Sequence, residues 1–153
     1  MFRRTLLSTR FTPSIIYRQQ ARFISTELKD ALDKAVTSTP VVLFMKGTPE
    51  FPQCGFSRAT IQTLGNVGVD PNKFAAYNVL EDEELRNGIK EYSSWPTIPQ
   101  LYVNGEFIGG CDIITSMASS GELAELLEEQ NALVPEEEEI DEVESADVKP
   151  NRK

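Results

Sequence analysis

The segment Pro-Gln-Cys-Gly-Phe-Ser at residues 52–57 contains Cys54, one of only two cysteines in this chain of 153 residues. A second cysteine three positions later would complete a dithiol redox motif, but Ser57 stands there instead. The thiolate form of a cysteine is both a nucleophile and a metal ligand. When a single thiol attacks a mixed disulfide, no neighbouring thiol can release the product. Turnover at Cys54 would therefore need an external thiol such as glutathione.

Composition excludes several other kinds of chemistry. The chain has no histidine, which rules out Ser-His and Cys-His catalysis and disfavours a zinc site made by protein side chains alone. After residue 26 it carries 10 basic and 24 acidic residues, and such a surface repels nucleic acid. No apolar run reaches about 18 residues, so no membrane span is predicted. We expect neither nucleic acid nor a membrane among its partners.

The elements around Cys54 explain how its thiol could be activated. Residues 41–45, Val-Val-Leu-Phe-Met, are a continuous apolar run that predicts a buried strand. A loop rich in glycine and proline leads to Cys54, and residues 55–67 predict a helix. The thiol then lies at a helix N-terminus, where unpaired N–H groups and the helix dipole lower its pKa. Lys46, at the end of the strand, adds positive charge.

The rest of the pattern predicts alternating strands and helices. A strand is expected at residues 74–79, and helices at 27–36 with Thr26 as N-cap, at 82–92, and at about 121–130. Residues 99–108 read as two short strands around Asn104-Gly105, which is typical of a type I′ hairpin. Asp112 is expected to cap a helix running to about Ser119.

Strands separated by helices favour parallel pairing through right-handed crossovers, and the hairpin adds an antiparallel part. We therefore predict an α/β fold with a four-stranded mixed sheet and helices on both faces.

The two ends of the chain differ in composition from its middle. Residues 1–26 contain five arginines and no acid, which is typical of a mitochondrial presequence, a basic tail being the alternative. Residues 134–153 are rich in acids and almost free of apolar side chains. They cannot offset the entropy of ordering, so we expect a disordered tail that serves solvation or docking. The folded domain is predicted at residues 27–133.

The chain resembles the monothiol glutaredoxins in three features taken together. These are Lys46, the Cys-Gly-Phe-Ser tetrapeptide at residues 54–57, and the segment Trp-Pro-Thr-Ile-Pro-Gln-Leu-Tyr-Val-Asn-Gly-Glu-Phe-Ile-Gly-Gly-Cys-Asp at residues 95–112. The resemblance covers residues 27–133 and, with the basic leader, is to the mitochondrial single-domain group. It implies a thioredoxin-like fold that binds glutathione. It also implies a cis peptide bond before Pro99, which would present the Ile98 backbone to glutathione in strand-like pairing.

The resemblance assigns the remaining contacts to the two ends of glutathione. Lys46 and Arg86 would bind its glycine carboxylate, although Arg86 taken alone reads as part of a solvated helix face. Thr97 and Ile98 would line the groove between the two ends.

At the γ-glutamyl end, the backbone N–H groups of Cys111 and Asp112 would bind the carboxylate. The Asp112 side chain would accept the ammonium, with helix capping alone as the alternative. Cys111 would contribute either its backbone only or also a reversible bond to Cys54.

Members of the family bind a 2Fe–2S cluster, which needs four thiolates or their equivalents. Two subunits would give two Cys54 sulfurs and two glutathione molecules the rest, so the resemblance implies a homodimer bridged by the cluster. We therefore expect a cluster carrier in the mitochondrial matrix. Its expected partners, by resemblance, are a BolA-like protein, an Hsp70-type chaperone and recipient iron–sulfur proteins.

Two other functions stay open. The thiol and groove would also suit a glutathione-dependent oxidoreductase that reduces protein–glutathione mixed disulfides. A redox-inert adaptor is the third reading. Phe56, next to the thiol, is either an exposed docking residue or part of the core.

Overall fold

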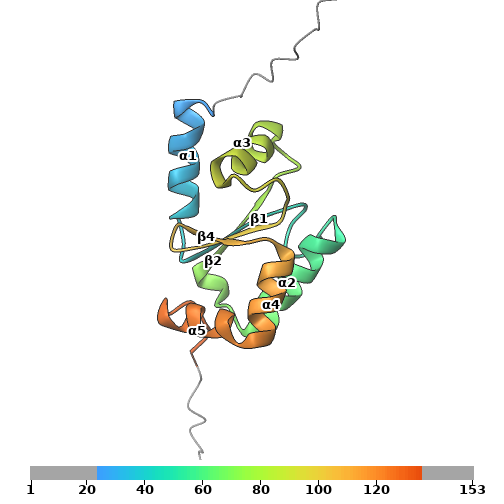
Figure 1. The fold of residues 1–153 in the computed structure, drawn as a ribbon, viewed down its shortest axis with the longest axis vertical. Helices are drawn as coiled ribbons and strands as arrows, with labels where there is room; N and C mark the ends of the chain where they lie inside the picture. Colours follow the sequence, from blue (N-terminus) through green and yellow to red (C-terminus); the bar gives the residue numbers. More distant parts are fainter. Residues whose placement is uncertain (1–23, 136–153) are drawn as a thin grey trace, which may run out of the picture.

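The computed structural model describes residues 24–135 (Figure 1). The predicted presequence at residues 1–26 and the predicted tail at residues 134–153 lie almost entirely outside this range. Helix α1 spans Thr26–Val36, and the Ser25 hydroxyl caps it by accepting from the Leu28 N–H at 3.2 Å. The predicted cap at Thr26 is therefore wrong by one residue, because the extended backbone of Ser25 already points its side chain at the first turn.

A four-stranded mixed sheet forms the centre of the fold, as predicted. Its strands are β1 (Val41–Met45), β2 (Phe74–Asn78), β3 (Gln100–Val103) and β4 (Glu106–Gly109), in the order β2-β1-β3-β4. Strand β1 pairs parallel with β2 and antiparallel with β3, and β3 pairs antiparallel with β4. The β3–β4 turn has positive φ at both Asn104 (48°) and Gly105 (81°), which confirms the type I′ hairpin.

Helices cover both faces of the sheet (Figure 1). Helices α1 and α3 (Glu83–Ser93) lie on one face, and α2 (Gly55–Val67), α4 (Cys111–Ser120) and α5 (Glu122–Glu129) on the other. A short 3-10 turn, η1 (Pro71–Lys73), precedes β2. Strand β1 is buried along its whole length because its side chains alternate between the two faces. Val42 and Phe44 pack with α1 and α3, whereas Leu43 packs with α2, α4 and α5.

Element boundaries agree with the sequence where a strong local signal sets them. Strand β1 and helix α2 have the predicted limits. Helix α3 starts one residue later than predicted because the Asp82 carboxylate accepts from the Glu84 and Leu85 N–H groups and so caps it. Asp112 does not cap α4, which corrects that prediction. The N-cap is Gly110, it makes no side-chain bond, and Asp112 already lies in the first helical turn.

Candidate functional site

Cys54 is the N-cap of α2 and reaches the helix through extended backbone (φ −143°, ψ 155°). Its sulfur accepts a hydrogen bond from the Ser57 N–H at 3.3 Å. This N–H is one of the groups that a helix start leaves without an internal partner. The thiol therefore lies where both the backbone and the helix dipole favour a negative charge.

The Ser57 hydroxyl is the second contact of the sulfur, with its oxygen 3.4 Å from the Cys54 sulfur. Ser57 is fully buried, and its oxygen also accepts from the Lys46 N–H at 3.0 Å. Because that oxygen already accepts from Lys46, its own hydrogen can be donated to the thiolate. The residue that replaces a resolving cysteine therefore supports the charge of the one that remains.

These contacts decide the protonation of the thiol. Burial acts to raise the pKa of Cys54, but the Ser57 hydroxyl, the N–H groups of Ser57 and Phe56 and the Lys46 charge act the other way. Together they hold the pKa of the Cys54 thiol below its ordinary value of 9.0. The thiolate population, which does the chemistry, is correspondingly enlarged near neutral pH.

The loop before Cys54 is a small, rigid hairpin. Thr48 and Phe51 exchange two backbone hydrogen bonds of 3.2 and 3.1 Å, and the Gln53 N–H donates to the Lys46 carbonyl at 2.9 Å. Gly47 has φ +91°, and a Cβ there would lie 2.4 Å from the Phe51 carbonyl oxygen, so the turn requires glycine. The Gly47 N–H donates to the Asn78 side chain at 2.9 Å, which joins the hairpin to the end of β2.

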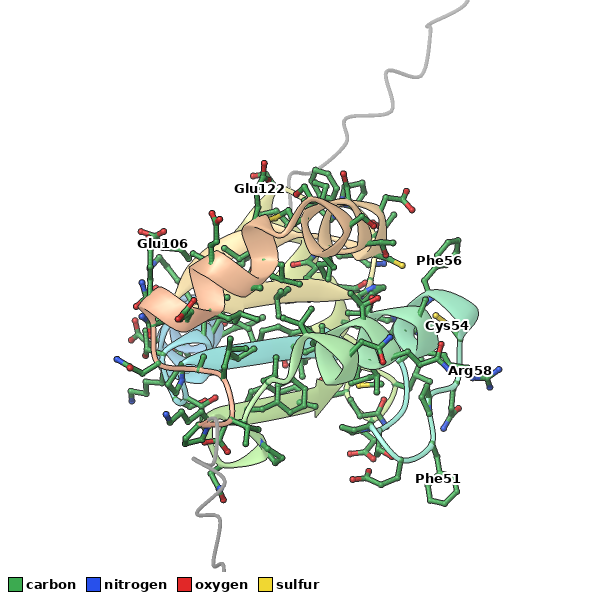
Figure 2. All side chains as sticks on the ribbon, turned by 90° about the horizontal axis from the view of Figure 1, so that it is seen from below. Phe51, Cys54, Phe56, Arg58, Glu106 and Glu122 are labelled. Carbon is green, nitrogen blue, oxygen red and sulfur yellow. The ribbon has the colours of Figure 1, made fainter. Side chains whose placement is uncertain are left out.

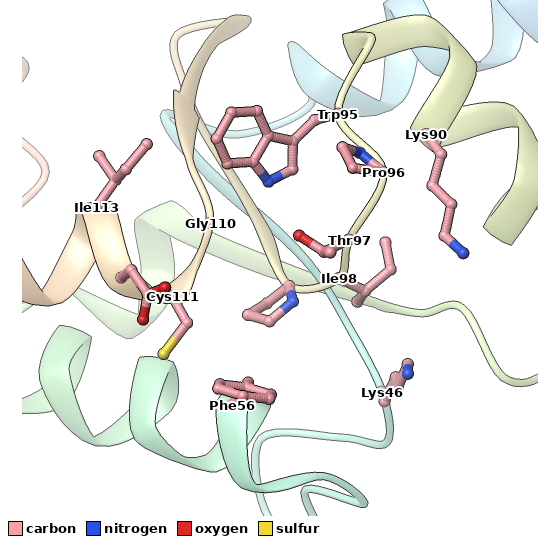
Figure 3. A pocket seen from close by; sticks show the side chains of 12 residues that line it. Lys46, Phe56, Lys90, Trp95, Pro96, Thr97, Ile98, Gly110, Cys111 and Ile113 are labelled. Carbon is pink, nitrogen blue, oxygen red and sulfur yellow. The ribbon is translucent and has the colours of Figure 1, made fainter.

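A pocket of about 340 Å³ opens beside this helix start (Figure 3). It lies between the N-terminus of α2, the segment before β3 and the N-terminus of α4. The peptide bond between Ile98 and Pro99 is cis, as the family resemblance implied. The lining residues are Lys46, Phe56, Lys90, Trp95, Pro96, Thr97, Ile98, Pro99, Gly110, Cys111, Asp112 and Ile113.

Five of the six residues predicted to bind glutathione line this pocket. They are Lys46, Thr97, Ile98, Cys111 and Asp112. Arg86 does not line it, and its guanidinium lies 3.7 Å from the Glu83 carboxylate in an ion pair on α3. Cys54 does not line the pocket either, but two residues close to it do. One is the neighbouring Phe56. The other is Lys46, whose N–H donates to the same Ser57 hydroxyl that contacts the Cys54 sulfur.

Lys90 is a pocket residue that the sequence reading missed. It lies one turn after Arg86 on α3, and Figure 3 shows its side chain at the same end of the pocket as Lys46. The sequence did contain a signal for Lys90. It follows Arg86 by four residues, and this spacing puts both cations on one side of the helix. The pocket thus has two lysines at one end and Asp112, with the first N–H groups of α4, at the other.

Gln100 is a second residue that the sequence reading missed. It is fully buried in β3, and its amide donates to the Trp95 and Thr97 carbonyls at 3.0 and 3.1 Å. These bonds fix the segment that forms one wall of the pocket. The signal was a lone amide residue at the start of an otherwise apolar strand.

Within residues 24–135, no three His, Cys, Asp or Glu side chains come together as a metal-binding group. Both cysteines are free thiols. One copy of the described part of the chain therefore offers a thiol beside a pocket with two lysines at one end, rather than a complete metal centre. No helix of this part is long and apolar enough to cross a membrane.

Comparison with known proteins identifies close relatives. A family model described as Glutaredoxin matches residues 41–108. A protein named monothiol glutaredoxin-5, mitochondrial, from Saccharomyces cerevisiae is 73% identical over 82% of this chain and 84% of its own length. The protein of the same name from Lachancea kluyveri is 68% identical over 89% of this chain and 95% of its own length. These names support a mitochondrial location for this chain.

Solved structures agree with the sequence relatives. The reduced apo form of the poplar glutaredoxin GrxS14 has 57% identity and a TM-score of 0.59, covering 68% of this chain and 93% of its own. The thioredoxin-like fold expected from the sequence is thereby confirmed.

Proposed function

Because the chain belongs to the monothiol glutaredoxins, we propose that it is a carrier of 2Fe–2S clusters in the mitochondrial matrix, where it receives a cluster and passes it to recipient proteins. The observation that carries the proposal is the pairing of Cys54 with Ser57. A dithiol could close into a disulfide after the first sulfur reacts. Here the neighbouring group is a hydroxyl that stabilises the thiolate and cannot oxidise, so the thiolate stays available as a metal ligand.

The pocket supports the proposal because it suits glutathione. Lys46 and Lys90 would bind the glycine carboxylate, and the first N–H groups of α4 would bind the γ-glutamyl carboxylate. The Asp112 side chain, which lines the same pocket, would accept the ammonium. The backbone of Ile98, which lines the pocket, would pair with the central cysteinyl residue. Glutathione held in this way would place its sulfur next to that of Cys54.

The ligand count supports a shared cargo. A 2Fe–2S cluster takes four thiolates, and the described part of one chain offers Cys54 next to one glutathione pocket. Two chains with two glutathione molecules would complete the set, so the loaded form would be a homodimer bridged by the cluster. Half of the ligands would then be exchangeable small molecules, which favours release to a recipient. A BolA-like protein and an Hsp70-type chaperone are the partners proposed for loading and delivery.

Anaerobic reconstitution of the full chain with iron, sulfide and glutathione tests this function. We expect a visible absorption spectrum of a 2Fe–2S cluster, a dimeric mass, and loss of both when glutathione is omitted. Cys54→Ser should abolish binding, whereas Cys111→Ser, which keeps the backbone contacts, should retain it. Full cluster binding by Cys54→Ser would refute the assignment of this ligand.

The lowered pKa of Cys54 favours a second candidate function, the reduction of protein–glutathione mixed disulfides. The Cys54 thiolate would attack the glutathione sulfur, release the protein thiol and form a Cys54–glutathione disulfide. A second glutathione thiolate would then reduce that disulfide and leave as glutathione disulfide. Efficient turnover on a glutathionylated peptide by cluster-free protein would place this function first.

A further inference from the structure

Two large apolar side chains are exposed on either side of Cys54. Phe51 is 78% exposed and Phe56 is 63% exposed, the two highest values among the large hydrophobic side chains that the structure describes as exposed. Figure 2 shows both projecting, with Arg58, from the same end of the molecule as Cys54. Exposed apolar groups gathered around a reactive residue mark an interaction surface more often than singly scattered ones do. We call Phe51, Phe56 and Arg58 the thiol-side surface.

Hydrogen bonds hold the backbone that carries this surface. The Phe51 backbone exchanges two bonds with Thr48, and its N–H also contacts the Thr48 hydroxyl at 3.2 Å. Phe56 and Arg58 lie in the first turns of α2, and the Arg58 N–H donates to the Cys54 carbonyl at 3.0 Å. A backbone that is already ordered loses little conformational entropy on binding. The turn thus presents Phe51 to solvent although burial would favour hiding it.

The charge of the surface indicates what it binds. Residues 24–135 carry 16 acidic and 7 basic side chains, yet Arg58 makes no salt bridge to any residue in this range. Glu50, next to Phe51 in sequence, lines a different hollow with Ile61 and Leu64. In the proposed cluster-bridged dimer the Arg58 side chains of both copies would come to the same interface, and their repulsion would favour release of the second copy. A carboxylate on a different protein would be complementary.

We propose that the thiol-side surface docks a polypeptide partner that carries an apolar side chain and a carboxylate beside its own reactive sulfur. Phe51 and Phe56 contact the apolar group and Arg58 pairs with the carboxylate. The inference rests on the proposed function, in that Cys54 is the group that the partner must reach. In the bridged dimer this end of the molecule faces the second copy, so the partner docks as that copy leaves.

Thiol–disulfide exchange tests the surface without any cluster. Two synthetic peptides carry one cysteine in a mixed disulfide with thionitrobenzoate, flanked by leucine and glutamate in one and by serine and lysine in the other. The Cys54 thiolate attacks the peptide sulfur, a Cys54–peptide disulfide forms, and thionitrobenzoate leaves with the electron pair of the broken bond. All proteins carry Cys111→Ser so that one thiol reacts. We expect the leucine–glutamate peptide to react about tenfold faster.

Matched variants assign the preference to individual residues. Arg58→Glu should abolish or reverse the preference for the leucine–glutamate peptide. Lys34→Glu changes the net charge equally, at an exposed position of α1 far from the Cys54 end, and should leave the preference unchanged. Phe51→Ser should lower the rate of the leucine peptide, whereas Val134→Ser, which removes a 51% exposed apolar side chain elsewhere, should not.

Equal rates for the two peptides, or equal effects of Arg58→Glu and Lys34→Glu, would overturn the proposal. So would self-association of the cluster-free wild type that Phe51→Ser abolishes, because the occupant would then be a second copy. Cluster reconstitution, measured in parallel, tests the proposed carrier function separately from the peptide preference. If wild type shows the peptide preference but binds no cluster, the carrier function is wrong and the docking surface remains.

Discussion

Ser57 shows how one residue can change the chemistry of its neighbour. Its oxygen accepts from the Lys46 N–H and contacts the Cys54 sulfur, so it ties the thiol to the end of β1. A cysteine there could form a disulfide with Cys54, whereas the Ser57 hydroxyl can only hydrogen-bond to it. Because the pKa of Cys54 is lowered, its thiolate persists below pH 9.0 and is lost as the pH falls through the lowered pKa.

Ser57→Ala should raise the pKa of Cys54. The pH of half-maximal alkylation by iodoacetamide, measured on single-cysteine protein carrying Cys111→Ser, should therefore move upward. The substitution also leaves the part-buried Lys46 N–H without its acceptor, which costs about 1 kcal/mol of unfolding free energy. Thr63→Ala removes another α2 hydroxyl, bonded only to the Ala59 carbonyl, and should leave the alkylation profile in place. An unchanged profile in Ser57→Ala would contradict the role given to the hydroxyl.

The two cations of α3 should contribute unequally to glutathione binding. Lys90 lines the pocket, whereas Arg86 is paired with Glu83. Lys90→Gln should weaken glutathione affinity about tenfold, because it removes a charge-assisted contact, and Arg86→Gln should weaken it less. Calorimetric titration of cluster-free protein with glutathione compares them. A larger loss in Arg86→Gln would mean that its side chain leaves Glu83 for the ligand.

Among the elements, Gly88 lies at a close contact between α1 and α3. A Cβ on Gly88 would lie 2.5 Å from the Leu28 side chain, so any larger residue there would require that side chain to move. The Tyr92 hydroxyl donates to the Asp33 carboxylate at 2.7 Å across the same contact. Burial and this bond raise the pKa of Tyr92 to about 12. Since α3 carries Lys90, this packing also places one wall of the pocket.

Gly88→Ala should destabilise the protein although alanine is the better helix former. Overpacking against Leu28 should cost about 1–3 kcal/mol, measured as the free energy of unfolding in urea. Gly65→Ala in α2 is the matched control, because nothing lies within 4 Å of its added Cβ. Helix propensity should make that variant more stable by up to about 1 kcal/mol. If both substitutions stabilise the protein, Leu28 and α1 can move away from the added methyl group without lowering the free energy of unfolding.

At the scale of the whole molecule, β1 separates two apolar cores. One lies under α1 and α3, the face that contributes Lys90, and the other joins α2, α4 and α5. The thiol and the end of the pocket that contains Asp112 depend on α2 and α4, which both pack on the second core. Leu127 of α5 is fully buried there.

Leu127→Ala should lower the free energy of unfolding by about 2–5 kcal/mol through the cavity that it leaves. The alkylation profile of Cys54 should not change, because the thiol is set by contacts within α2 and its preceding loop. Thermal unfolding and alkylation of the same sample measure both. A shifted alkylation profile would mean that packing under α5 reaches the helix start.

Short stretches of the chain predicted the features that neighbouring residues control. The apolar run of β1, the Asn104-Gly105 turn and the placement of Cys54 at the start of α2 were all readable, because each follows from local backbone preferences and side-chain alternation. The mixed sheet followed from the order of these elements. Five of the six residues predicted to bind glutathione also line one pocket, and four of these five belong to the compact segment at residues 95–112.

Contacts between distant residues followed from the folded chain and not from any motif. It brought Lys90 rather than Arg86 to the pocket, set the Ser57 hydroxyl between Cys54 and the Lys46 backbone, and pressed Gly88 against Leu28. Each pairing depends on how far a helix is rotated and how closely it packs on the sheet. Those quantities come from the summed contacts of the two cores, and no short stretch of the sequence contains them.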